Sequence, residues 1–298
     1  MFYVINMKEK TIDEGKYRMH LLRILRFFIS FCEKYNLTYC CATGTMLGAV
    51  RHHDIIPWDD DIDVFMPRRD YESLLSIAPE MENEGFRLIS AYNCPSYATF
   101  AKIYSKDTTL WELESIPFIY GIYIDIFPLD ECSDTKAEFS KKYRHFRNLF
   151  RKYQLSQIQF NAKRFWGCLK EGDKKMAIKE FASVFFPIFL SERYKKQIIN
   201  FENIVSKEVG DHLVSYYGDY WDREYFDKKW FRSYIEMPFS DFKVKVPVGY
   251  HEYLTNVYGD YMKFPPVEKR VSHHYHYYLN MDKGMTLDEV RNVLKNDK

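Results

Sequence analysis

Five carboxylates fall within ten residues of this chain, between Asp54 and Asp63. Asp61 and Asp63 stand two apart in a segment, 61–66, whose alternation of polar and apolar residues predicts a β-strand. Residues two apart on a strand share a face at a spacing of roughly 6.5–7 Å, so the two carboxylates would repel each other unless a cation lay between them. Oxygen ligands of this kind suit Mg²⁺, which binds one or two carboxylates together with substrate phosphates.

Two other interpretations of the acidic segment remain. In a calcium-binding EF-hand, Asp59, Asp61 and Asp63 would take the first, third and fifth loop positions. Val64 then stands where a glycine is needed, and Asp70 where a glutamate is expected, which argues against this loop. A solvated acidic turn is the better alternative, so the segment alone favours a metal site only modestly.

A third carboxylate lies in a second predicted strand, 120–127. Asp125 has apolar residues on both sides there, and an isolated ionised carboxylate in such surroundings would be costly. It therefore needs a partner, and a metal ion shared with Asp61 and Asp63 would supply one.

Thr43, Gly44 and Thr45 lie between a predicted strand, 38–42, and a predicted helix, 46–50. A glycine lets the backbone approach a phosphate closely, and the amides at a helix N-terminus attract anions. The threonine hydroxyls add donors, and Arg51 could bind a phosphate with two parallel hydrogen bonds. A plain strand-to-helix turn would explain the glycine equally well.

The surrounding pattern predicts a mixed α/β region up to residue 130. A capping box at 11–14 opens an N-terminal helix, and Pro67 opens another. Further strands are predicted at 86–89 and 99–104. From 135 to 209 the pattern is helical and rich in lysine and arginine. The basic run at 141–147 predicts a helix face exposed to solvent. The alternative is a face that contacts a phosphate-bearing acceptor or a membrane surface. Later segments predict strands at 230–235 and 242–246 and helices from 250 and 286.

Composition limits the class of protein. The 298 residues carry 43 lysines and arginines against 42 aspartates and glutamates, so the net charge of +1 gives no overall attraction to nucleic acid. The six cysteines form no C-x-x-C pair, and the first eight residues are too short an apolar run for a secretion signal, so we expect reduced thiols in the cytoplasm. The longest apolar run, 181–190, is too short to cross a membrane and predicts a buried helix end, with an interfacial anchor as the alternative.

Taken together, these motifs resemble the LicD family of phosphotransferases, which is similar to the fukutin-type transferases. The segments that carry the resemblance are Gly44 to Arg51, Ile56 to Val64, Ala101 to Ile103 with Thr108, Asp125 to Asp130, and Tyr258 to Tyr261 continuing through Pro265-Pro266 to Arg270 and His274. These segments run in order from about residue 37 to 275, and no part of 131–235 can be aligned with the family.

The resemblance implies an α+β fold: a nucleotidyltransferase-like mixed sheet core with flanking helices and a helical insertion. The expected division is a core with the metal site at 1–130, a helical insertion at 131–235, and a C-terminal segment at 236–298 that completes the core.

The resemblance also implies an enzyme. Family members transfer a phospho-alcohol, best known as phosphocholine from CDP-choline, to a hydroxyl of a cell-surface glycan such as lipopolysaccharide or teichoic acid, and release CMP. Ribitol phosphate and glycerol phosphate are alternative groups. The expected partners are therefore a CDP-activated donor and a glycan acceptor, without nucleic acid, and with a peripheral contact at the inner face of the membrane.

Residues can be given roles on the same basis. Mg²⁺, or Mn²⁺, would be held by Asp61, Asp63 and Asp125, and Asp125 or Asp63 would accept the proton of the acceptor hydroxyl. The residues expected to bind substrate are Thr43, Gly44, Thr45, Arg51, Asp59, Lys102, Arg270, His273 and His274. Lys102 could instead be a strand lysine that reaches water, and the histidines could form a plain surface cluster.

Two rival functions share parts of this pattern. A nucleotidyltransferase acting on a small molecule would use the same glycine turn and the same pair of aspartates. A non-catalytic module with this fold would have lost an acidic ligand, whereas Asp61, Asp63 and Asp125 are all present.

Overall fold

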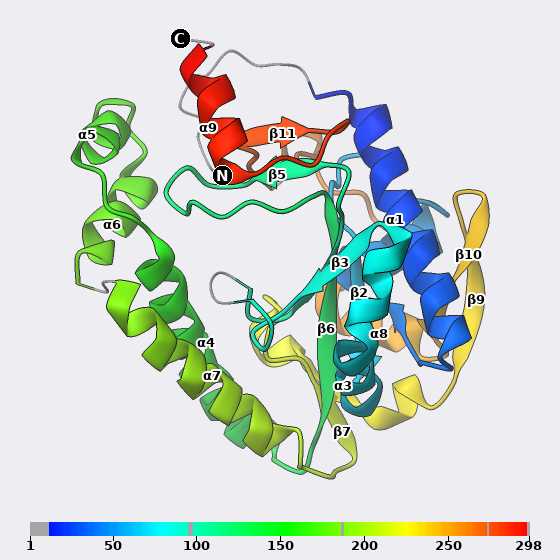
Figure 1. Cartoon of the computed structure of the whole chain (residues 1–298). Coiled ribbons are helices and arrows are strands. Elements are labelled where there is room, and N and C mark those ends of the chain that lie inside the picture. Colours follow the sequence, from blue (N-terminus) through cyan, green and yellow to red (C-terminus); the bar gives the residue numbers. More distant parts are fainter. Residues whose placement is uncertain (1–11, 95–97, 186–187, 273, 297–298) are drawn as a thin grey trace.

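The computed structural model describes residues 12–94, 98–185, 188–272 and 274–296 (Figure 1). Its helices are α1 (Glu14–Lys34), α2 (Thr43–Arg51), α3 (Arg68–Ile77), α4 (Lys136–Gln157), α5 (Ala162–Lys170), α6 (Lys174–Ser183), α7 (Ser191–Val205), α8 (Tyr250–Tyr258) and α9 (Leu287–Asn296). Its strands are β1 (Cys40–Cys41), β2 (Asp63–Pro67), β3 (Phe86–Ile89), β4 (Ala101–Ser105), β5 (Thr109–Trp111), β6 (Tyr123–Cys132), β7 (His212–Val214), β8 (Tyr225–Asp227), β9 (Tyr234–Phe239), β10 (Phe242–Pro247) and β11 (Tyr278–Asn280). Short 3₁₀ helices are η1 (Ala78–Glu84), η2 (Ile188–Leu190), η3 (Trp221–Arg223), η4 (Lys228–Phe231) and η5 (Val267–Lys269).

The main sheet is mixed, with the strand order β1-β2-β6-β4-β3, and β7 extends it by pairing with β6 and β8. Strands β2 and β6 run parallel, whereas β4 and β7 pair with β6 antiparallel. The ten-residue strand β6 therefore lies at the centre of the sheet (Figure 1). Strand β2, which begins at Asp63, lies beside β6, which contains Asp125. The expected α+β fold with a mixed sheet is confirmed.

Helix α1 forms much of the main core. Asp13 caps its N-terminus by accepting a hydrogen bond from the backbone N–H of Lys16 at 3.0 Å, and Leu21, Leu25 and Phe28 are fully buried on its apolar face. The helix was expected from a capping box at 11–14, but its cap is Asp13, and Thr11 lies outside the described residues.

Several boundaries differ from the sequence pattern. Strand β3 is found where it was predicted, and the Thr286–Glu289 capping box opens α9 as expected. Strand β2 begins at Asp63, so Asp61 precedes the strand and the argument that placed both carboxylates on one strand face is wrong. Helix α2 begins at Thr43, three residues earlier than predicted.

The middle of the chain forms a second layer. Helices α4 and α7 lie side by side as a long pair (Figure 1). Buried aromatic residues such as Phe139, Phe146 and Tyr153 form a core cluster with residues of α7 and strand β7. Strands β7 and β8 fall within the segment expected to be a helical insertion, yet they extend the main sheet. The run 141–147 lies on α4, where Lys142 forms ion pairs with Asp134 and Glu208.

Helices α5 and α6 lie at one end of the α4–α7 pair. Here the expectation that 181–190 forms a buried helix end is wrong, because Phe181, Phe185 and Phe189 are 55%, 65% and 76% exposed. Within the described residues, every helix is too short or too polar to span a bilayer. The six cysteines are all buried thiols.

Candidate functional site

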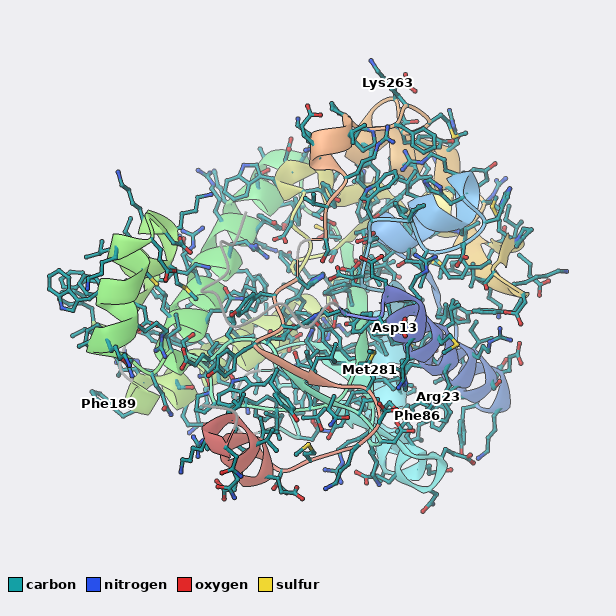
Figure 2. The ribbon with its side chains drawn as sticks, turned by 90° about the horizontal axis from the view of Figure 1, so that it is seen from above. Asp13, Arg23, Phe86, Phe189, Lys263 and Met281 are labelled. Carbon is teal, nitrogen blue, oxygen red and sulfur yellow. The ribbon has the colours of Figure 1, made fainter. Side chains whose placement is uncertain are left out.

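A cleft of about 620 Å³ opens beside the N-terminus of α2 and the start of β2. Two segments from later in the chain form its other walls: 217–220, which we call the tyrosine loop, and 261–265, which we call the C-terminal loop. Lys263, on the C-terminal loop, lies at the outer edge of the molecule in Figure 2. The cleft therefore joins the first quarter of the chain to its last quarter.

Asp59, Asp61 and Asp63 all line this cleft. Asp59 lies against the first turn of α2, so closely that a Cβ atom on Gly44 would be 2.7 Å from its Oδ2 atom. The glycine is thus required by the approach of a carboxylate to the helix terminus. Ala42 offers no side-chain cap to α2, and the backbone N–H of Thr43 donates to the hydroxyl of Tyr253 at 3.3 Å. The amides that follow Thr43 in the first turn can meet an anionic group in the cleft.

Asp63 is held by two threonines of α2. The hydroxyl of Thr43 donates to the Oδ2 atom of Asp63. The backbone N–H of Asp63 donates to the hydroxyl oxygen of Thr45 at 2.8 Å. Burial, then the charges of Asp61 and Asp125, raise the pKa of Asp63 well above its ordinary value. Thr43 also adopts a left-handed φ of +38°, a strained conformation for a β-branched residue.

His274 enters the acidic segment from the C-terminal part of the chain. Its Nδ1–H donates to Oδ1 of Asp60 at 2.8 Å, its Nε2 atom lies 3.7 Å from Oδ2 of Asp61, and Ser272 also donates to Asp60. Burial disfavours the charged ring, but the bond to Asp60 and the charge of Asp61 raise the pKa of His274 to about 10. The imidazolium therefore neutralises part of the cluster at neutral pH.

Asp125 has a partner that the sequence did not indicate. The ammonium group of Lys102, opposite it on β4, donates to its Oδ1 atom at 2.6 Å and lies 3.8 Å from the centre of the Tyr123 ring. Both side chains are buried, so Lys102 does not reach water and that alternative is wrong. The need of Asp125 for a positive charge is thus met within the sheet.

The donor set of the cleft fits a hard divalent cation. Asp59, Asp61 and Asp63 offer carboxylate oxygens, which Mg²⁺ and Mn²⁺ prefer. Burial raises the pKa of each, and neighbouring carboxylates add to this effect, so the ionised cluster is short of positive charge despite His274. A cation at this position would remove that repulsion. Asp125 is the register partner of Asp63 on the next strand, but it does not line the cleft.

The two arginines expected to bind substrate, Arg51 and Arg270, hold the C-terminal loop in place. Arg51 donates to the carbonyl of Tyr261 at 2.7 Å, and Arg270 donates to the carbonyl of Pro265 at 2.9 Å. Their guanidinium groups lie 4.8 and 5.4 Å from the centre of the Phe264 ring. Arg51 also lines the cleft, so it can serve both the loop and a bound anion.

The helical middle of the chain positions the tyrosine loop. Tyr143 and Arg147 of α4 donate to the carbonyls of Gly218 and Tyr217 at 2.5 and 3.2 Å. Glu202 of α7 accepts a hydrogen bond from the Tyr217 hydroxyl at 3.1 Å. Beneath the loop, the buried Glu224 accepts the N–H of Tyr220 at 3.1 Å and packs so tightly that only glycine fits at 218.

The structure brings together most of the residues expected from the sequence. Those that line the cleft are Thr43, Gly44, Arg51, Asp59, Asp61, Asp63 and His274. Thr45, Lys102, Asp125 and Arg270 support these residues or lie beside them, and His273 lies outside the described residues. The sequence analysis missed Tyr217 and Tyr220, which belong to the segment where no motif could be aligned. Tyr220 donates to the hydroxyl of Tyr258, itself part of a motif, at 2.8 Å.

Comparison with known proteins gives two kinds of match. Residues 36–167 match a family model described as LicD/FKTN/FKRP, nucleotidyltransferase domain. The chain is 30% identical over 274 residues to the lipopolysaccharide cholinephosphotransferase LicD of Haemophilus influenzae, a match that covers 90% of this chain and 97% of that protein. An uncharacterised protein of Rickettsia prowazekii is 37% identical over 81 residues, which is 26% of this chain and 30% of that protein.

Proposed function

This chain belongs to the LicD family, and from that premise we propose that it transfers a phospho-alcohol from a CDP-activated donor to a hydroxyl of a cell-surface glycan, with release of CMP. The relative from Haemophilus influenzae is named for choline phosphate and lipopolysaccharide, so CDP-choline and lipopolysaccharide are the first donor and acceptor to test. A teichoic acid acceptor and a ribitol- or glycerol-phosphate donor are the alternatives within the same chemistry.

The gathering of Asp59, Asp61 and Asp63 in one cleft carries this proposal. We propose that Asp61 and Asp63 would hold Mg²⁺ from the wall of the cleft, with Asp125, the register partner of Asp63 on the next strand, as the third ligand. When bound, the ion would neutralise the diphosphate of the donor and polarise the phosphorus toward attack. A metal-free cluster of this kind would repel the same diphosphate.

The residues around the acidic cluster then have separate tasks. The amides that follow Thr43 in the first turn of α2 would hold the oxygens of the transferred phosphate, while the hydroxyl of Thr43 stays bonded to Asp63. Asp59 lies against Gly44, beside this phosphate position, and we propose that its carboxylate accepts the proton of the attacking acceptor hydroxyl. Position favours Asp59 over Asp125, which is bonded to Lys102 and does not line the cleft.

The cleft wall is suited to an alcohol with a cationic head. Trp58, Tyr217, Tyr220 and Tyr258 all line it. A quaternary ammonium group binds well to the faces of tryptophan and tyrosine rings, whereas ribitol and glycerol gain little from them. This wall is the observation that favours choline among the three donors.

We propose that the reaction takes place in the cytoplasm, because six buried cysteines without a disulfide are typical of a reducing compartment. A nucleotidyltransferase acting on a small molecule remains the second candidate, since it would use the same carboxylates. The products separate the two: the proposed enzyme releases CMP, whereas a nucleotidyltransferase joins the nucleotide to its acceptor.

The deciding experiment measures CMP release from CDP-choline, CDP-ribitol and CDP-glycerol with a glycan acceptor, with Mg²⁺ and with EDTA. We expect CDP-choline to be used best, and only with the metal. Asp61→Asn should lose both turnover and Mn²⁺ binding measured by calorimetry, whereas Asp59→Asn should lose turnover and keep Mn²⁺ binding. Metal-independent turnover would refute the metal site, and a product that retains the nucleotide would refute the reaction.

A further inference from the structure

The end of the helical middle carries a large exposed apolar surface. We call it the aromatic face. Its members are Phe160, Trp166, Leu169, Ile178, Phe181, Val184, Phe185 and Phe189, each between 42% and 76% exposed. Single exposed apolar residues are ordinary, but a contiguous patch of this kind marks an interaction site.

Ring contacts join four members of the aromatic face, Phe160, Trp166, Phe181 and Phe185, through the half-buried ring of Phe165. Phe165 lies 5.4 Å from Trp166, 6.2 Å from Phe160 and 6.2 Å from Phe181, between ring centres. Phe181 in turn lies 5.6 Å from Phe185. The two helices thus present one aromatic surface and not scattered side chains.

Helices α5 and α6 bury little of their own surface. Cys168 is the buried residue of α5, and those of α6 are Ala177, Glu180 and Ser183. The larger part of both helices therefore faces outward. Figure 1 shows α5 and α6 at the end of the α4–α7 pair, and Figure 2 shows Phe189, which belongs to η2, at the outer edge of the molecule and well away from Lys263 at the cleft.

The charge around the aromatic face is positive. Lys163 and Lys170 of α5 and Lys174 and Lys175 of α6 are exposed. Of the three acids in 160–190, Glu180 is buried against Arg164 and Asp173 caps α6 by accepting the N–H of Met176 at 3.0 Å. The exposed Glu171 is the third, and it is outnumbered by the four exposed lysines. A partner that fits this face must therefore offer an apolar surface to the aromatic residues and anionic groups to the lysines around them.

We propose that the aromatic face docks on the surface of an anionic phospholipid bilayer. Short amphipathic helices with exposed Trp, Phe and Leu and flanking lysines insert their apolar side chains at the boundary of head groups and acyl chains, while the lysines meet lipid phosphates. A protein partner would need a hydrophobic surface ringed by acidic residues, which is a narrower requirement. The bilayer satisfies both the apolar and the charged part of the face.

This docking goes beyond the proposed reaction and can be tested without it. Wild-type protein is mixed with vesicles of phosphatidylcholine and phosphatidylglycerol at 70:30, and bound protein is measured by sedimentation. We expect binding that weakens in high salt, together with a blue shift of tryptophan emission. Trp166→Phe should abolish the shift, whereas Trp221→Phe, which removes a similarly exposed tryptophan elsewhere, should keep it.

Two sets of variants test the face itself. The triple variant Phe181→Ser, Phe185→Ser, Phe189→Ser should bind vesicles at least tenfold more weakly. A matched triple at exposed apolar positions elsewhere, Met19→Ser, Ile204→Ser, Val209→Ser, should bind like wild type. Lys174→Gln with Lys175→Gln should weaken binding to anionic vesicles by about fivefold per lysine and leave the weaker binding to neutral vesicles unchanged.

Three outcomes would overturn the proposal. They are no vesicle binding by the wild type, equal loss in both triple variants, and a dimer by light scattering that the face triple converts to monomer without any vesicle binding. The last would make the face a contact between two copies. Because the face triple should still release CMP with a soluble acceptor, failure of docking and failure of the proposed reaction give different results.

Discussion

Asp63 and Asp125 lie directly opposite each other on the parallel strands β2 and β6, yet they are balanced by different groups. Asp125 has the ammonium of Lys102 at 2.6 Å, whereas among the described residues Asp63 is bonded to a neutral hydroxyl. These two adjacent carboxylates, the half-buried Asp63 and the buried Asp125, therefore differ in whether a positive charge balances them. Asp63 is the one that needs an added cation, and it is the one that faces the cleft.

Asp63→Asn should separate function from folding. The amide can still accept the hydrogen bond of Thr43, and it removes a buried charge that two neighbouring carboxylates repel. We expect CMP release to fall by about 10²–10³-fold. In EDTA the free energy of unfolding should stay equal to that of wild type or rise by about 1 kcal/mol. Asp288→Asn, on the exposed surface of α9, is the control, and full activity of Asp63→Asn would contradict the metal assignment.

Lys102→Met should destabilise the fold. It leaves Asp125 buried beside Asp63 without its cation, which costs about 3–5 kcal/mol of unfolding free energy. Burial already raises the pKa of Asp125, and without Lys102 it rises further, so the lost stability should be greater at pH 8 than at pH 5. Urea unfolding at both pH values checks this. Lys102→Met with Asp125→Asn should recover most of the loss, and an equally unstable double variant would show that packing, not charge, is responsible.

Gly44→Ala should affect the site more than the fold. The new Cβ would lie 2.7 Å from Oδ2 of Asp59, and the carboxylate can move aside only by leaving its position at the helix terminus. We expect CMP release to fall by about 10–100-fold, since small displacements of a catalytic group have such effects. Gly167→Ala, where a Cβ meets open space, should stabilise α5 by about 0.5–1 kcal/mol and leave activity unchanged. Equal activity of both variants would refute the role given to Asp59.

Stability should fall as the pH rises from 6 to 9. Burial raises the pKa of Glu202 to about 7 and that of Glu224 to about 8. Both values exceed those of the unfolded chain, so the two carboxyls stabilise the fold fully below their unfolded pKa and lose this contribution as the pH rises through 7 and 8.

Glu224→Gln provides the test of that pH dependence. It should reduce the slope by up to about 1.4 kcal/mol per pH unit between about pH 6 and pH 8, because over this range the folded chain keeps a proton on Glu224 that the unfolded chain has lost. Thermal unfolding across this pH range is the measurement. Glu268→Gln, on the exposed η5, should follow the wild-type curve, and a flat wild-type curve would show that Glu224 and Glu202 are already ionised in the folded protein over this range.

The sequence predicted the parts of this site that depend on local pattern. The glycine turn, the acidic segment and the buried strand around Asp125 could all be located, and the order of the motifs indicated the family. The start of β2 could not, because it depends on the bond from the Asp63 N–H to the Thr45 hydroxyl, which no period-two pattern records. The Lys102–Asp125 pair depends on the register of β4 against β6, and register is set by the whole sheet.

The cleft wall was the hardest part to foresee. Tyr217 and Tyr220 are placed by side chains of α4 and α7, such as Arg147, which is 70 residues away along the chain from the carbonyl that it holds. Contacts between residues so far apart in the sequence do not change the spacing of apolar residues along a helix, so helix periodicity does not predict them. The run 181–190 was misjudged for a related reason, since its composition is the same whether the helices cover it or leave it exposed.

The bond between Asp60 and His274 spans 214 residues, so the two halves of the cluster are not made at the same time. At a synthesis rate of about 5–20 residues per second, the carboxylates exist for roughly 10–40 seconds before their imidazolium is joined to the chain. During this interval the acidic segment carries its negative charges without that counterion. The acidic segment of a nascent chain could therefore bind cellular divalent cations before its own histidine, His274, has been synthesised.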